Sequence, residues 1–231
     1  MSQKISEGLS SAAIKLIAII AMTADHIAWR IAPGFDTRAW VLALHCIGRM
    51  TAPIMWFFIA EGYAKTRSLP RYALRLLILA VISHFAWCFC FSRPFFGGKT
   101  SVIWSLLMGL LCLWVYERES LRPWQRACLI ALLLIAALPA DWSCVGASAI
   151  LVIGANRGDF RRQALGLMLC TGAYALYFSL TSNAVYGVLQ LFTCLALVPL
   201  TYYNGERGGT RLTGRLFYAY YPIHLLLIGL L

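Results

Sequence analysis

The sequence predicts an all-α protein, a polytopic transmembrane bundle of about nine helices with its N-terminus inside and its C-terminus outside. Of the 231 residues, 61% are hydrophobic and only 13% are charged, whereas soluble domains carry about 25% charged residues. The mean hydropathy is +0.73, and apolar runs long enough for membrane spans recur along the chain. Lysine and arginine gather in alternate connecting segments, which is typical of a multi-pass membrane protein.

The apolar runs define the expected helices in order. A helix crosses the hydrocarbon core in about 20 residues, and turn-forming glycine, proline, asparagine and aspartate residues separate the runs. The fifth and sixth runs are short enough to be tilted, re-entrant or fused. No repeat or linker divides the chain, so residues 1–231 are expected to form one membrane domain. The expected spans are 12–32, 39–63, 71–91, 101–116, 126–139, 142–155, 162–180, 184–202 and 215–231.

The basic residues orient these spans. They are concentrated in segments 65–75, 118–126, 157–162 and 207–215, while the intervening connections hold only Arg30, Arg38, Arg93 and Lys99. Cytoplasmic loops are enriched in lysine and arginine, so the alternation predicts an N-in and C-out chain. The net charge of +11 does not indicate nucleic-acid binding, because the charges lie between apolar runs rather than on one folded face.

The eight cysteines are scattered, mostly inside apolar runs, and no pair has C-x-x-C spacing. Neither a disulfide framework nor a zinc site is indicated. The histidines also lack the H-x-x-x-H spacing of a helical metal site. Metal binding by several histidines is the less favoured alternative, and no metal is expected.

The first span carries Lys15, Asp25 and His26 inside the membrane, although a charge near the bilayer centre costs a few kcal/mol. These residues and the absence of a small-residue cleavage site argue against a signal peptide. Lys15 and His26 share one helix face about 16 Å apart, and Asp25 points about 100° away from His26. Asp25 is therefore expected to pair with another helix, such as the one bearing Arg49. The structural alternatives are a snorkelling lysine and a histidine that links two helices.

Further polar residues fall in three other spans. His45 and Arg49 share a face of the second span, His84 lies in the outer half of the third, and His224 follows Tyr221 in the last. Under one topology all these residues and the first-span histidine lie at mid-depth or in the outer half, so we predict a site there. Histidine suits a general base, and arginine can stabilise an oxyanion. His45, His84 and Tyr221 are predicted to contact substrate.

The cytoplasmic rim is a second candidate region. Lys15, Arg71 and Arg75 have the charge needed to bind the phosphates of a nucleotide-like donor. The simpler alternative is that these side chains only follow the positive-inside rule.

Four segments together resemble the TraX family, which is named for a conjugal-transfer protein that acetylates the N-terminus of pilin. They cover nearly the whole chain in order and spacing, although the middle is generic hydrophobic sequence. The segments are I-K-L-I-A-I-I-A-M-T-A-D-H (14–26), G-R-M-T-A-P-I (48–54), E-G-Y (61–63) and F-Y-A-Y-Y-P-I-H-L (217–225).

A basic residue, ten intervening residues and a histidine also look like the wider set of membrane acyltransferases. That set includes bacterial polysaccharide O-acetylases and heparan-α-glucosaminide N-acetyltransferase. The basic position is usually arginine in the polysaccharide enzymes, and here it is Lys15, which keeps the charge but loses bidentate geometry.

The resemblance implies an enzyme of the bacterial inner (cytoplasmic) membrane that transfers an acetyl or acyl group. The donor would be cytoplasmic acyl-CoA, with acetyl-CoA as co-substrate, and the acceptor a pilin-like protein or a glycan. His26 would be the general base, Arg49 would organise the site, and His224 would assist, with Asp25 also in the catalytic set. Two other hypotheses stay open, namely a small-molecule transporter using the same polar residues as its path and a non-catalytic assembly subunit.

Overall fold

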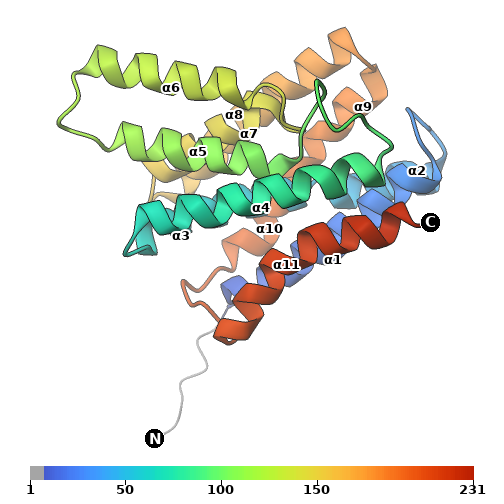
Figure 1. Cartoon of the computed structure of the whole chain (residues 1–231), viewed down its shortest axis with the longest axis horizontal. Helices are drawn as coiled ribbons and strands as arrows, with labels where there is room; N and C mark the ends of the chain where they lie inside the picture. The colour runs from blue at the N-terminus through green and yellow to red at the C-terminus, as the bar shows by residue number, and fades with distance from the viewer. Residues whose placement is uncertain (1–7) are drawn as a thin grey trace, which may run out of the picture.

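The computed structural model describes residues 8–231, apart from the side chain of Arg211, and contains no strand in that range. The chain folds into helices that run back and forth along one direction (Figure 1). These are α1 (Ser11–Ile31), α2 (Ala39–Gly48), α3 (Thr51–Lys65), α4 (Leu69–Cys90), α5 (Val102–Tyr116), α6 (Pro123–Ala137), α7 (Ser143–Ala155), α8 (Phe160–Thr181), α9 (Ala184–Leu189), the 3-10 helix η1 (Gln190–Ala196), α10 (Leu197–Thr201) and α11 (Arg211–Gly229).

Every apolar run predicted as a span is helical, and the all-α prediction is confirmed. Local signals set several helix starts. Ser10 accepts a hydrogen bond from the backbone N–H of Ala13 at the start of α1, and Asp159 does the same for Arg162 at α8. Such caps satisfy N–H groups that have no partner within the helix. The predicted turn residues likewise fall between helices.

Five helical segments are long and apolar enough to cross a bilayer. Helices α5, α6 and α7 are apolar but have only 13 to 15 residues, or about 20–22 Å of helix. The expected count of nine crossings and its orientation therefore stay predictions. The five segments are Ser11–Ile31, Ala39–Lys65, Leu69–Cys90, Phe160–Thr181 and Ala184–Thr201.

The second predicted span is not one continuous helix, because it breaks at Arg49 and Met50 between α2 and α3. Pro53 has no N–H to donate to the carbonyl of Arg49, and proline is tolerated in the first turn of a helix. Pro53 is the third residue of α3, so the sequence favours a new helix start here. The eighth span is similarly divided into α9, η1 and α10.

The short helices α6 and α7 are not fused, because residues 138–142 separate them. This connection is tied to the one between α4 and α5 by a hydrogen bond from the backbone N–H of Thr100 to the carbonyl of Pro139, 2.8 Å long. The two connections therefore lie together in the fold.

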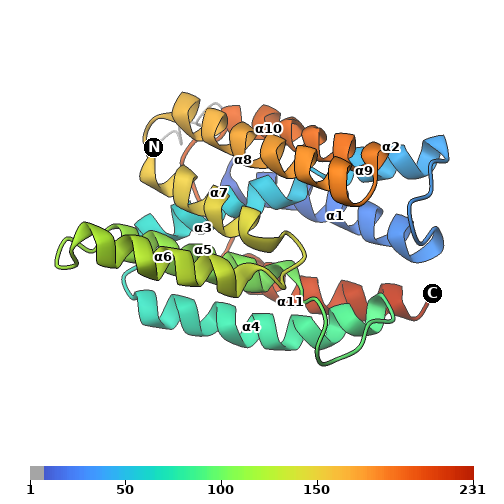
Figure 2. The ribbon, with the colours of Figure 1, turned by 90° about the horizontal axis from the view of Figure 1, so that it is seen from above.

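The helices form two groups around a central space. Helix α4 packs against α11 and α5, while α1 packs against α2, α3 and α11. Figure 2 shows α4 lying apart from α1 and α3, while α11 lies between α4 and α1 and contacts both. Side chains of both groups therefore face the interior of the bundle, where they can line a shared cavity.

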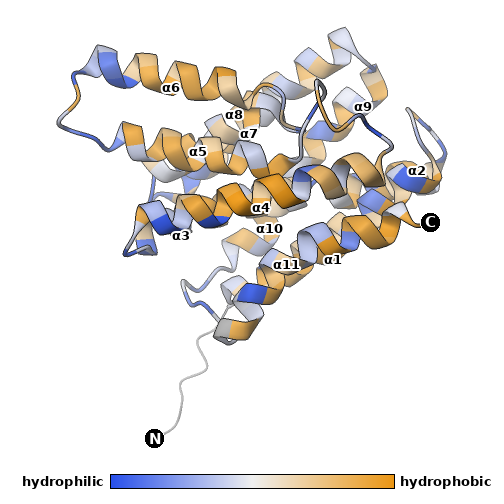
Figure 3. Ribbon diagram, viewed as in Figure 1, coloured by the Kyte–Doolittle hydropathy of each residue, from blue (hydrophilic) through white to orange (hydrophobic). Residues whose placement is uncertain are grey.

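Apolar side chains also cover much of the outer surface. Leu132, Ile135, Leu169 and Leu180 on α6 and α8 are 60% to 77% exposed. Figure 3 shows hydrophobic residues along the helices and hydrophilic ones mainly toward the helix ends and connections. Water does not favour such a surface, whereas lipid does, so the arrangement supports a membrane protein.

Candidate functional site

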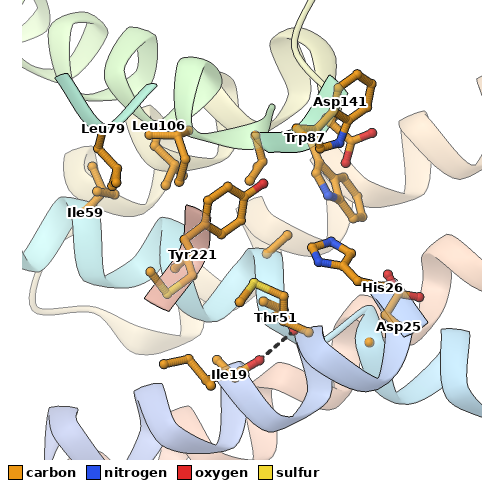
Figure 4. A pocket seen from close by; sticks show the side chains of 18 of the residues that line it. Ile19, Asp25, His26, Thr51, Ile59, Leu79, Trp87, Leu106, Asp141 and Tyr221 are labelled. Atoms are coloured by element: carbon orange, nitrogen blue, oxygen red, sulfur yellow. Dashed lines mark hydrogen bonds between the residues drawn. The ribbon is translucent and has the colours of Figure 1, made fainter. Parts of the chain in front are cut away.

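A cavity of about 1410 Å³ occupies the space between the two helix groups. Its lining begins near Lys15 at the start of α1 and extends to Pro33 and Phe35 in the connection after α1. Apolar residues of α3, α4 and α5 form part of the wall, including Ile59, Leu79 and Leu106, which are visible in Figure 4. The cavity thus follows α1 along nearly its whole length.

Two histidines from opposite ends of the chain form a hydrogen-bonded pair. His26 on α1 lines the cavity, and its Nδ1 lies 2.8 Å from Nε2 of His224 on α11. His224 Nδ1 lies 3.0 Å from the backbone carbonyl of Tyr220. His224 itself is only 3% exposed and does not line the cavity. It therefore contacts His26 on the side that faces away from the cavity.

The hydrogen bonds assign tautomers to this pair when both rings are neutral. A carbonyl oxygen only accepts, so His224 carries its proton on Nδ1 and donates it to Tyr220. His224 Nε2 is then an acceptor, and His26 must donate to it from Nδ1. This leaves Nε2 of His26 as an unprotonated nitrogen with no hydrogen-bond partner among the described residues. His26 is therefore prepared to accept a proton inside the cavity (Figure 4).

A second polar cluster lies next to His26 on α1. The Asp25 carboxylate accepts hydrogen bonds from Nη2 of Arg49, at 3.1 and 3.0 Å, and lies 2.6 Å from Nδ1 of His45. The predicted pairing of Asp25 with Arg49 is thus confirmed. Arg49 also donates to Gln190 over 3.3 Å and lies 5.5 Å from the ring centre of Trp142.

Gly48 allows this cluster to form. A Cβ at this position would overlap the side chain of Asp25, so only glycine lets α2 approach α1 so closely. The break after Gly48 then places Arg49 in the cavity wall. Both Asp25 and Arg49 line the cavity, and their mutual charge neutralisation compensates for burial.

The two histidines predicted to bind substrate, His45 and His84, do not line the cavity. His45 is fully buried, between the rings of Trp29 and Tyr186, because its bond to Asp25 directs it into the helix packing. His84 lies 3.0 Å from Thr100 Oγ1 and 2.7 Å from the carbonyl oxygen of Phe95. These contacts turn it toward the connection after α4. Neither side chain faces the cavity, whereas Tyr221 does line it. Contact of these three residues with substrate stays a prediction.

The start of α1 forms a cationic end of the cavity. Lys15 and Arg75 line it as predicted, but Arg71 does not, because it lies one turn earlier on α4. Lys15 Nζ lies 4.7 Å from the ring centre of Phe58. Four further cations that sequence reasoning placed only in loops also line this end, namely Lys65, Arg67, Arg207 and Arg215.

Sequence reasoning also missed Asp141, Trp142, Tyr186 and Gln190 as lining residues. Asp141 stands between two apolar runs and reads as part of a short turn. Within residues 8–231, no group of three or more histidine, cysteine or acidic side chains is arranged to hold a metal ion. The described site therefore consists of the histidine pair, the Asp25 cluster and the cationic end.

The chain is similar to known proteins over nearly its whole length. A sequence model of the family described as TraX protein matches residues 10–231. A probable fimbrial assembly protein, FimC of serogroup H1 from Dichelobacter nodosus, is 29% identical over 229 residues, which cover 93% of this chain and 92% of that protein. No solved structure matches the chain.

Proposed function

Because this chain belongs to the TraX family, we propose that it is a membrane-embedded acetyl- or acyltransferase. It moves an acetyl group from cytoplasmic acyl-CoA to an acceptor at or across the bacterial inner membrane. The observation that carries the proposal is the unprotonated Nε2 of His26, which faces a large cavity whose other end is cationic. The similarity to a probable fimbrial assembly protein favours a pilin-like acceptor over a glycan.

The proposed reaction uses His26 as general base. Its Nε2 takes a proton from the amine or hydroxyl of the acceptor as that group attacks the thioester carbonyl carbon. A C–N or C–O bond forms, the C–S bond breaks, and the proton returns to the departing CoA thiolate. Arg49 is proposed to stabilise the tetrahedral oxyanion, while Asp25 holds Arg49 and His224 holds the His26 tautomer.

The donor is proposed to bind with its phosphates at the cationic end. Lys15 and Arg75 are exposed to that part of the cavity, and charged hydrogen bonds to phosphate are strong and specific. The apolar stretch toward His26 would hold the pantetheine arm and the acyl group. Arg71 is retained only as a peripheral charge.

The proposed topology has nine crossings, with the cationic end on the cytoplasmic side. The alternating lysine and arginine segments support it. In this topology the short helices α5, α6 and α7 cross the membrane as well. The connections after α4 and after α6 would then lie inside the bundle rather than outside the bilayer. Labelling of single cysteines introduced into consecutive connections tests this topology, because accessible sites must alternate between the two sides of intact cells.

The activity is tested by transfer of labelled acetyl from acetyl-CoA to an acceptor peptide in proteoliposomes. We expect transfer by the wild type and loss of transfer in His26→Ala. Since the cavity lining reaches both ends of α1, a transporter is the second candidate. Substrate flux across the liposome membrane without acetyl transfer would favour the transporter and reject the enzyme.

A further inference from the structure

Asp141 is an acidic side chain that the proposed reaction leaves without a role. It lies in the connection between α6 and α7 and lines the cavity. Figure 4 shows that its carboxylate and the ring of His26 both project into the cavity, near Trp87. The side chain is exposed, but this exposed surface faces the cavity inside the bundle.

Asp25 and Asp141 are the two carboxylates among the described lining residues, and they differ in their partners. Asp25 bonds to Arg49 and His45. Asp141 has no hydrogen bond and no ion pair within residues 8–231. A carboxylate accepts several hydrogen bonds, so Asp141 has its full accepting capacity available to a ligand.

The surrounding charges do not fill that capacity. Arg49 is already engaged by Asp25. Lys99 and Arg93, in the connection after α4, also line the cavity, but within residues 8–231 neither forms an ion pair with Asp141. The protein that surrounds the cavity keeps bulk water away from the Asp141 carboxylate and so raises its pKa, and these three cations only partly oppose that effect. A cationic ligand at hydrogen-bonding distance would therefore stabilise the ionised carboxylate.

The connection that carries Asp141 is held in place. The hydrogen bond from Thr100 to Pro139 joins it to the connection after α4, and Trp142 packs edge-on against Trp56 at 5.2 Å between ring centres. The next residue after Asp141 is thus anchored in the core. A fixed carboxylate loses little freedom when a ligand binds.

We infer that Asp141 recognises the acceptor as a primary ammonium group and makes the enzyme selective for amines over neutral hydroxyls. This rests on the proposed function, in which the acceptor approaches His26 through the same cavity. An α-amino group has a pKa near 7.7–8.0 and is mostly cationic at neutral pH. One ammonium proton is lost to water, and the neutral amine then attacks the thioester carbonyl carbon. His26 takes the second proton from the nitrogen during the attack and returns it to the thiolate as the C–S bond breaks.

The test compares three proteins in the full chain, namely wild type, Asp141→Asn and Asp141→Glu. The probe is an apolar peptide with a free α-amino group, and the matched neutral probe carries a terminal hydroxyl instead. We expect Asp141→Asn to raise KM for the amine peptide by at least about tenfold, with unchanged KM for acetyl-CoA and for the hydroxyl peptide. Asp141→Glu keeps the carboxylate, so its KM for the amine peptide should stay close to that of the wild type. Asp36→Asn, outside the cavity, is the control.

Equilibrium binding of the same amine peptide and its N-acetylated form separates this inference from the proposed function. Preferential binding of the free amine that disappears in Asp141→Asn supports the inference even if no acetyl is transferred, in which case the proposed function fails alone. Equal KM values and equal binding in wild type and Asp141→Asn would overturn the inference while leaving acetyl transfer intact. Equal affinity of the wild type for the free-amine and N-acetylated peptides would also overturn the inference.

Discussion

The charged side chains at the two ends of the cavity differ in whether they have a partner. Near His26, the groups of the proposed reaction have fixed partners, as shown by the His26–His224 pair at 2.8 Å and the Asp25–Arg49 bonds at 3.0 and 3.1 Å. Asp141, which lines the same part of the cavity, is the exception described above. At the cationic end, Lys15 and Arg75 make no ion pair among the described residues. The first region, defined by His26, His224 and the Asp25–His45–Arg49 cluster, is called here the paired centre.

The contrast indicates a division of labour. Groups that must be in one protonation state or orientation during a reaction benefit from a fixed hydrogen-bond network. Unpaired cations instead leave their charge available to an anionic ligand, at the cost of mutual repulsion while the site is empty. The paired centre is therefore suited to chemistry, and the cationic end to binding a phosphorylated donor.

The largest effect should come from replacing the central histidine. His26→Ala removes the proposed base, and general-base catalysis contributes about 10²–10⁴-fold, so kcat for acetyl transfer should fall by that factor. His84→Ala is the matched control, because His84 lies outside the cavity lining. Equal loss in both variants would show that the position of His26 has no special role.

Breaking the buried pair should be the next largest effect. Asp25→Asn leaves Arg49 without its carboxylate, and removal of one partner from a buried ion pair costs about 3–5 kcal/mol. The free energy of unfolding in detergent micelles should fall by that amount. Asp36→Asn removes an exposed ion pair with Arg38 and should leave stability unchanged within error. Similar losses in the two variants would contradict the burial argument.

Much of this fold was predictable, because the properties that set it are local. Apolar runs and turn residues located every helical region, although not the breaks within the second and eighth spans. Helix geometry indicated that Asp25 turns away from His26 toward another helix. Tertiary packing was not predictable in the same way. His45 and Arg49 share a face of the predicted second span, yet the bond of His45 to Asp25 directs it between Trp29 and Tyr186, away from the cavity.

Asp141 is the opposite case, a residue that lines the cavity although its sequence context did not predict it. Nothing in its neighbourhood marks a site, since a lone aspartate between two apolar runs is typical of a turn. Only the folding of its connection toward α4, through the bond between Thr100 and Pro139, brings it into the cavity. Contacts between residues far apart in the chain decide such positions, so the periodicity of one helix carries no information about them.

A backbone position can also break the paired centre. Gly48→Ala would place a methyl group against Asp25, and overpacking of this kind costs about 1–3 kcal/mol. Gly172→Ala in α8 is the control, because no atom lies within 4 Å of the added Cβ and alanine favours helix. Thermal unfolding midpoints should fall for the first variant and stay constant or rise for the second.

The smallest effect belongs to the cationic end, where single charges act among several. Arg75→Gln should raise KM for acetyl-CoA by roughly two- to fivefold, the range expected for a weakly screened pair of about 0.5–1 kcal/mol, with kcat nearly unchanged. Arg71→Gln, one turn away on the same helix but outside the lining, should change neither value. Steady-state kinetics at low and high salt checks the origin of the effect, because added salt should reduce the difference between wild type and Arg75→Gln. If Arg71→Gln raises KM for acetyl-CoA as much as Arg75→Gln does, the donor is bound by the general charge of the rim rather than by the side chains that line the cavity.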